Sequence, residues 1–155
     1  MPLQFRLARR SDYDSVEHMV ISSFEPITWF KKLDERYGSL NGMDWRQRWR
    51  ARMTRVFETE IGLVGETGSS MVAFASGTLD SQTRMGFVDL LAVDRSQQGK
   101  GYGREMLRGM LDHFKREGAL YVNLECLVDN DTGNSLYRSE GFEEVARSIR
   151  WFKKL

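Results

Sequence analysis

Residues 86–117 read GFVDLLAVDRSQQGKGYGREMLRGMLDHFKRE, and this stretch decides the fold. Its first part, 87–93, is rich in aliphatic and β-branched residues and predicts a buried strand. A polar turn follows at 94–97, and then a loop with glycines at 99, 101 and 103. The last part predicts an amphipathic helix, because apolar residues recur every three or four positions: Met106, Leu107, Met110, Leu111 and Phe114.

The glycine loop predicts a site for a phosphate group. The first turn of a helix has backbone amides without internal partners and a partial positive charge. Glycine lets the backbone adopt positive φ and lets a ligand approach closely. The alternative is an ordinary strand-to-helix turn. The loop matches neither a Walker A loop nor the dinucleotide fingerprint, since Arg104 or Met106 stands where the latter needs its third glycine.

Two blocks carry a resemblance to a known family. The loop resembles the coenzyme A loop of the GNAT N-acetyltransferase superfamily, Arg/Gln-x-x-Gly-x-Gly/Ala, here filled by Gln98, Gly101 and Gly103. The block LECLVDNDTGNSLYRSEGFEEV, 124–145, is similar to the family's next segment at Leu124, Cys126, Asn130, Leu136, Tyr137, Gly141 and Phe142. Arg6, Ala8 and Asp12 fit the family's first strand and helix entry, whereas residues 22–58 match no family pattern.

The resemblance implies an acyltransferase, specifically an acetyl-CoA-dependent N-acetyltransferase. Such an enzyme moves the acetyl group to an amine by direct attack within a ternary complex. The alternative is a non-catalytic acyl-CoA-binding regulatory module with the same fold. The acceptor stays open between a protein N-terminus, a lysine, a polyamine and a small amine metabolite or drug. Homodimers are frequent in this family, and the closing strand is a candidate interface.

The chain predicts one α+β (three-layer α/β) domain over residues 1–155. We expect a mixed, mostly antiparallel sheet of six to seven strands with helices on both faces. The expected strands are 4–8, 60–66, 71–79, 87–93 and 120–128, followed by closing strands within 143–153. The fourth and fifth form a parallel, splayed pair, because a helix connects them. A coenzyme is expected where that pair opens.

Composition excludes several classes of protein. Lysine plus arginine number 23 against 22 acidic residues, so charge indicates neither nucleic acid nor a membrane surface as partner. Cys126 is the only cysteine, which excludes an internal disulfide framework. No apolar run reaches 18 residues and no hydrophobic signal core begins the chain. A cytoplasmic protein without a metal site is the expectation.

Acetyl transfer to an amine needs a base and an acid. A primary amine with a pKa near ~10.4 must lose a proton before it attacks, and the leaving thiolate needs one. By resemblance Tyr137 is the acid, with packing against Leu136 as the alternative. By the same resemblance Glu125 and Asp89 are the candidate bases, and both residues stand out because carboxylates are rare at strand centres. Either carboxylate is otherwise an ordinary edge or solvent-facing residue, and an ordered water is the remaining alternative.

The cofactor contacts follow from the two blocks. Backbone amides of 98–104 are expected to hold the diphosphate, and the backbone of 91–93 to pair with the pantetheine arm. Asn130 is expected to bond the same arm, and Gly133 to leave room for it. The predicted cofactor-binding residues are Leu91, Ala92, Val93, Gln98, Gly99, Lys100, Gly101, Tyr102, Gly103, Arg104, Asn130, Gly133 and Tyr137.

Residues 24–58 are rich in tryptophan and arginine. Pro26 and glycines at 38 and 42 divide the segment into at least two short helices. In the second, four apolar residues fall at helical spacing and predict a core stripe: Trp45, Trp49, Met53 and Val56. The other interpretation is a wall that shapes the acceptor site, for which the substrate-binding candidates are Phe24, Trp29 and Phe30.

Overall fold

The computed structural model describes residues 2–155 as two compact units, one up to Glu125 and one over Cys126–Leu155. The first unit holds a five-stranded sheet in the order β1-β2-β3-β4-β5. Its strands are β1 (Gln4–Leu7), β2 (Ile61–Thr67), β3 (Ser70–Asp80), β4 (Met85–Val93) and β5 (Tyr121–Leu124). The first four pair antiparallel and β4 pairs parallel with β5, which confirms the mixed sheet and its parallel pair.

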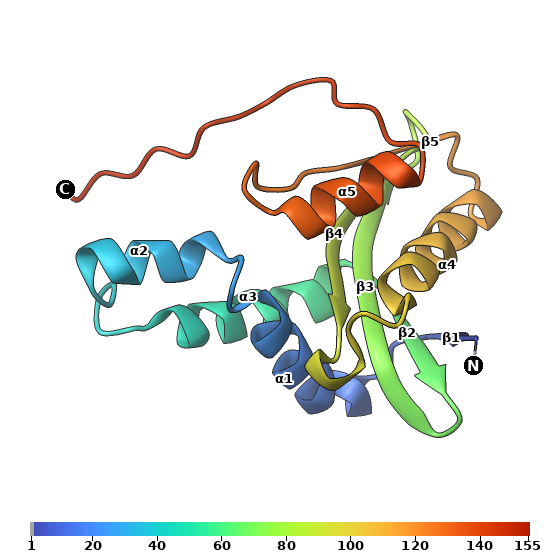
Figure 1. Ribbon diagram of the computed structural model, residues 1–155, viewed down its shortest axis with the longest axis horizontal. Coiled ribbons are helices and arrows are strands. Elements are labelled where there is room, and N and C mark those ends of the chain that lie inside the picture. Colours follow the sequence, from blue (N-terminus) through green and yellow to red (C-terminus); the bar gives the residue numbers. More distant parts are fainter. Residues whose placement is uncertain (1) are drawn as a thin grey trace. The chain divides into compact units, whose positions relative to one another are not determined.

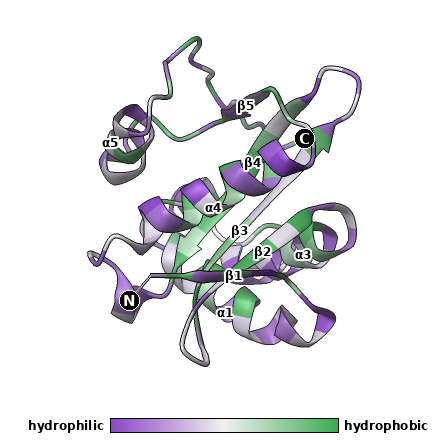
Figure 2. Cartoon of the chain, turned by 90° about the vertical axis from the view of Figure 1, so that its right-hand side faces the viewer, coloured by the Kyte–Doolittle hydropathy of each residue, from purple (hydrophilic) through white to green (hydrophobic). Residues whose placement is uncertain are grey.

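Helices of the first unit lie on both faces of the sheet (Figure 1). The helices on one side are α1 (Tyr13–Phe24) and α3 (Trp45–Thr59), and α4 (Tyr102–Arg116) lies on the other. A further helix, α2 (Trp29–Tyr37), packs on α3, and two 3₁₀ turns occupy Arg10–Asp12 and Arg95–Gln97. In Figure 2 the strands β3 and β4 are mostly white to green, whereas the helices alternate between purple and green.

The core on the α1–α3 side contains the predicted aromatic stripe. Trp45, Trp49, Met53 and Val56 expose 5%, 2%, 0% and 3% of their surface, so the core prediction for this stripe is confirmed. They pack with apolar residues of α1 and of the sheet: Val16, Met19, Val20, Val64, Phe74, Leu90 and Ala92. The helix itself begins at a capping box, in which Asp44 and Gln47 each accept the other's backbone N–H at 2.8 and 2.9 Å.

The opposite face is covered by the apolar stripe of α4. Met106, Leu107, Met110 and Phe114 are completely buried there. Phe114 lies directly on β3 and β4, because a Cβ at Gly77 or Gly86 would come within 2.9 Å of its ring. Close helix–sheet contact at this point therefore depends on glycine. The helix ends at Arg116, and Gly118 follows with φ of 97°, a left-handed conformation that favours glycine after a helix.

Two strand predictions are wrong. The fifth strand was expected over 120–128, but β5 ends at Leu124, because its partner β4 pairs with it only as far as Val88. The closing strands expected within 143–153 do not form in the described residues, which leaves five strands in place of six or seven. The alternation of Val145, Ile149 and Trp151 favours a strand, but a strand exists only through hydrogen bonds to a neighbour, and this segment pairs with none.

The second unit contains one helix, α5 (Asp131–Ser139), at the position expected from the Leu-Tyr block. Asn130 precedes it as N-cap, and its side-chain oxygen accepts the Gly133 amide at 3.1 Å. Residues 143–155 follow without a helix or strand, with 93% of Val145 and 88% of Trp151 exposed. None of the helices described for residues 2–155 combines the length and the hydropathy that crossing a bilayer requires.

Candidate active site

The glycine loop leads into α4 in the conformation that the sequence predicts. Gly99 and Gly101 have φ of 79° and 87°, a region that side-chain-bearing residues rarely adopt, and Gly101 is the N-cap of α4. A Cβ at either position would meet nothing within 4 Å, so both glycines face open space. Since a glycine N-cap has no side-chain oxygen, the first amides of α4 are left for a ligand or water.

The turn before the loop is held by its own polar groups. Asp94 Oδ1 accepts the Ser96 amide at 2.8 Å, and the Asp94 amide donates to the Val72 carbonyl at 2.9 Å. Gln98 Nε2 donates to the Val93 carbonyl at 3.2 Å, and Lys100 Nζ to Gln97 Oε1 at 2.9 Å. These bonds fix the loop at the carboxyl end of β4, which is where the fold places an anion-binding helix start.

The parallel pair opens beside this loop. Residues 85–88 of β4 pair with residues 121–124 of β5, and β4 then continues alone on that side to Val93. On its other side it stays paired with β3 as far as Val93. The free edge of β4 therefore includes Leu91, Ala92 and Val93, the backbone segment for which the sequence predicts a pantetheine contact.

Asp89 lies where the two strands separate. The pairing of β3 with β4 passes from Ser76↔Leu90 to Gly77↔Val88, so Asp89 is the extra residue of a β-bulge. Its Oδ1 accepts from Arg52 Nη2 at 2.7 Å, and the Arg52 guanidinium lies 4.8 Å above the Trp49 ring. Asp89 is thus a half-buried, ion-paired carboxylate and not a solvent-facing one.

A second carboxyl group, which sequence reasoning missed, joins Asp89. Glu60 ends α3 and precedes β2, and its Oε2 accepts from the Ser76 hydroxyl at 2.7 Å. Burial is the main reason why the pKa of Glu60 rises to about 7. The hydrogen bond from the Ser76 hydroxyl lowers this pKa, whereas the neighbouring Asp89 carboxyl group raises it. No local pattern marks Glu60 as functional, because its partners lie 16 and 29 positions away.

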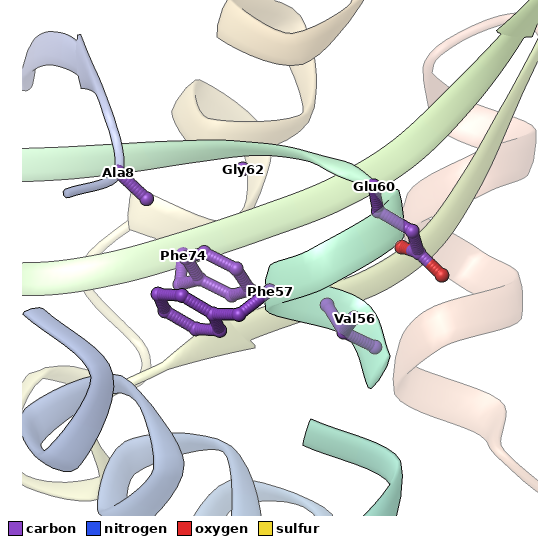
Figure 3. Close-up of a pocket in the computed structure, with 6 residues that line it drawn as sticks. All are labelled: Ala8, Val56, Phe57, Glu60, Gly62 and Phe74. Carbon is purple, nitrogen blue, oxygen red and sulfur yellow. The ribbon is translucent and has the colours of Figure 1, made fainter. Parts of the chain in front are cut away.

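A small cavity of about 50 Å³ lies next to Glu60 (Figure 3). The stacked rings of Phe57 and Phe74, 6.0 Å apart, form one wall of it. In Figure 3 the carboxyl group of Glu60 points away from these rings. Glu60 thus lines this cavity with its carboxyl group directed away from the two rings.

Glu125, the other candidate base, has a different environment. It follows β5 by one residue and is exposed. The structure joins Asp89 to a second carboxyl group, that of Glu60. Among residues 2–155 no group of three or more histidine, cysteine, aspartate or glutamate side chains has the arrangement of a metal site.

The second unit holds the remaining predicted residues. Burial raises the pKa of Tyr137 to about 12, with a smaller contribution from Cys126, so the phenol keeps its proton at neutral pH. Its ring packs edge-on against Phe142 at 6.0 Å. A Cβ at Gly133 would come within 2.7 Å of the Asn130 side-chain amide and 3.1 Å of Cys126 Sγ, so a larger residue here would displace the Asn130 side chain.

The three substrate-binding candidates lie around α2. Phe24 and Phe30 are half-buried against Trp49, with ring centroids 5.2 and 5.4 Å from it. Trp29 packs edge-on against Phe30 at 4.7 Å. All three therefore extend the core cluster toward the surface, and their contact with a substrate stays a prediction.

Comparison with known proteins identifies the family. The model of the acetyltransferase (GNAT) family matches residues 24–142. An N-alpha-acetyltransferase RimI from Mycobacterium tuberculosis is 44% identical over 66 residues, which are 43% of this chain and 40% of that protein. The match thus spans less than half of the relative's length.

Two solved structures share the fold. The ribosomal-protein-S18-alanine N-acetyltransferase from Escherichia coli superposes with a TM-score of 0.67 at 19% identity, over 93% of this chain and 79% of that one. The PaiA N-acetyltransferase from Thermoplasma acidophilum, in complex with coenzyme A, gives 0.66 at 16% identity, over 92% and 91%. With the family model covering most of its length, the chain belongs to the acetyltransferase (GNAT) family.

Proposed function

We propose that the protein is an N-acetyltransferase that moves the acetyl group of acetyl-CoA to an amine acceptor. The observation that carries the proposal is the joint placement of the Gly99–Gly101 loop, the open start of α4 and the free edge of β4. The loop amides suit a diphosphate, and an unpaired strand edge suits the amide groups of a pantetheine arm. A coenzyme A complex of a structural relative supports the same assignment.

The proposed reaction is direct attack of the amine on the thioester carbonyl. The bond from nitrogen to the acetyl carbon forms and the carbon–sulfur bond breaks. One proton leaves the amine for a base and one reaches the coenzyme thiolate from an acid. Tyr137 is the proposed acid, since a phenol with a pKa of about 12 still carries its proton at neutral pH. Asp89 and Glu125 remain the candidate bases from sequence.

A protein N-terminus is the acceptor class that the relatives favour. The matched relative from M. tuberculosis is named an N-alpha-acetyltransferase, and the structural relative from E. coli is named a ribosomal-protein-S18-alanine N-acetyltransferase. The family match runs across both units, which supports our proposal that residues 1–155 form one domain. A homodimer and a cytoplasmic location complete the proposal.

The test is a turnover screen with acetyl-CoA that reads the release of free thiol. The acceptors are a short peptide with an N-terminal alanine, the same peptide with its N-terminus blocked and a lysine added, spermidine, and an aminoglycoside. We expect turnover with the free N-terminus. Saturable binding of acetyl-CoA without turnover of any amine would favour a coenzyme-binding module, and no binding would refute the proposal.

A further inference from the structure

We propose that Glu60 is the group that takes the proton from the acceptor amine, as one half of a carboxyl pair with Asp89. This inference rests on the proposed function, because it assigns a role within amine acetylation. It replaces the choice between Asp89 and Glu125 by a pair that the folded chain assembles from α3, β3 and β4.

Strand register brings the pair together. Glu60 immediately precedes β2, and the first residues of β2 pair with Gly77 and Ser76 of β3. Ser76 in turn pairs with Leu90 of β4, next to Asp89. The bulge interrupts the regular alternation of β4 at Asp89, and the Asp89 carboxyl group interacts there with that of Glu60.

The charges around the pair are few and specific. Ser76 donates one hydrogen bond to Glu60 at 2.7 Å, and Arg52 from α3 donates one to Asp89 at 2.7 Å. Two carboxyl groups that share a hydrogen bond must hold a proton between them, and one positive charge does not compensate two negative ones. The pair therefore releases its proton near neutral pH, consistent with a Glu60 pKa of about 7.

Such a group suits the removal of a proton from an amine. A base is most effective when its pKa lies close to the working pH, because it is then largely ionised and still accepts a proton readily. In the proposed step the ammonium gives a proton to the Glu60 carboxylate, directly or through one water. The free amine then attacks the thioester carbon and the carbon–sulfur bond breaks. The second proton that the nitrogen loses as the amide forms replaces the one that the acid gives to the thiolate.

The location of the pair fits this task. Asp89 marks the residue at which β4 separates from β5, and the free edge expected to hold the pantetheine arm begins there. Asp89 is paired with the positively charged Arg52 guanidinium, whereas Glu60 accepts its hydrogen bond from the neutral Ser76 hydroxyl. Glu60 is therefore the member that exchanges the proton. Asp89 positions it and adds to the effect of burial on the pH at which the exchange occurs.

The experiment has a readout that does not depend on an acceptor. In protein with ¹³C-labelled carboxyl groups, NMR follows the Glu60 signal, assigned through its own backbone, from pH 4 to 9. We expect a midpoint near pH 7 in the wild type and a lower midpoint in Asp89→Asn, because the second negative charge is gone. A midpoint near the ordinary glutamate value in the wild type would overturn the inference.

The kinetic test uses the best amine from the screen and compares Glu60→Gln with Glu58→Gln, an exposed glutamate on the same helix. For Glu60→Gln we expect kcat/KM to fall by roughly 10²-fold or more. We also expect the loss of the decrease in kcat/KM that the wild type shows below about pH 7, the acid limb of its pH profile. Asp89→Asn is expected to remain active with its acid limb at lower pH, and Glu58→Gln to match the wild type.

The outcomes separate this inference from the proposed function. Calorimetry shows whether each protein binds acetyl-CoA. A wild type that binds no acetyl-CoA or acetylates no amine would remove the proposed function and this inference with it. If the wild type is active and Glu60→Gln has the same rate and pH profile, the inference about Glu60 is overturned and the proposed function stands. Loss of activity only in Asp89→Asn would make Asp89 the base.

Discussion

Tyr137 has a structural role in the fold beside the chemical role that we propose for it. Its ring packs against Phe142, and burial raises its pKa to about 12. The burial keeps the proton in place at any ordinary pH, which an acid needs, but it also makes the phenol a weaker donor than an exposed tyrosine. Both effects follow from the low dielectric around the ring.

At this scale we predict that Tyr137→Phe lowers kcat by roughly 10²-fold while the KM for acetyl-CoA changes little. The reason is that the substitution removes the proton donor and keeps the ring that packs on Phe142. Steady-state kinetics from pH 6 to 9 measure it, with Tyr121→Phe as control, since Tyr121 is 62% exposed. An unchanged kcat would show that Tyr137 only packs.

The raised pKa of Glu60 leads to a second prediction, which concerns the stability of the protein. Its folded-state pKa of about 7 lies above the ordinary value of 4.5, so the folded chain binds more protons between these pH values. The free energy of unfolding should therefore fall as pH rises from 4.5 to 7. Glu60→Gln removes this penalty.

Urea unfolding at pH 4 and pH 8 tests the prediction. The difference in the free energy of unfolding between Glu60→Gln and the wild type should shift in favour of the variant by on the order of 2 kcal/mol from pH 4 to pH 8. This value is smaller than the full pKa difference implies, because Glu60 is partly exposed. Glu58→Gln should show no such gain. A difference between Glu60→Gln and wild type that is the same at both pH values would contradict the raised pKa.

At the scale of elements, the loop before α4 is the part on which we propose that coenzyme binding depends. Its backbone conformation comes from Gly99 and Gly101 at positive φ, and its position from the hydrogen bonds of the turn at 95–97. Periodicity sufficed to predict the helix and the glycines sufficed to predict the loop, because both signals are local. The free edge of β4 is not local, since it depends on where β5 ends.

We predict that Gly101→Glu abolishes acetyl-CoA binding and leaves the fold intact. A glutamate there places negative charge at the expected diphosphate site. Gly68→Glu is the matched control, because Gly68 also has positive φ, 60°, and open space around it, but lies in the β2–β3 hairpin. Calorimetry and circular dichroism measure binding and fold. Equal affinity in the two variants would refute the phosphate loop.

At the scale of the whole molecule, residues 143–155 expose apolar side chains that a folded chain ordinarily covers. Val145, Ile149 and Trp151 are 93%, 74% and 88% exposed. Alternating apolar residues in extended backbone are suited to pairing with another strand. Pairing with a second copy is the arrangement that agrees with the homodimer proposed here.

We therefore predict a dimer that depends on this segment. Light scattering should give twice 18.0 kDa for the wild type at tens of micromolar and 18.0 kDa for the double variant Ile149→Ser, Trp151→Ser. The double variant Ser81→Ala, Thr83→Ala, in the exposed β3–β4 turn, is the control and should remain dimeric. A wild type of 18.0 kDa at every concentration would contradict the prediction.

The sequence by itself determined the mixed sheet with its parallel pair, the helix stripes, the glycine loop and the family. Each of these depends on residues close together in the chain, such as Gly99 with Gly101, or Trp45 with Trp49, where periodicity and backbone preference act directly. Tertiary structure alone decided where β5 ends, that 143–153 remains without a strand partner, and that Glu60 meets Asp89. Those outcomes depend on strand pairing and on one bulge, and the energy of a pairing is not contained in either segment alone.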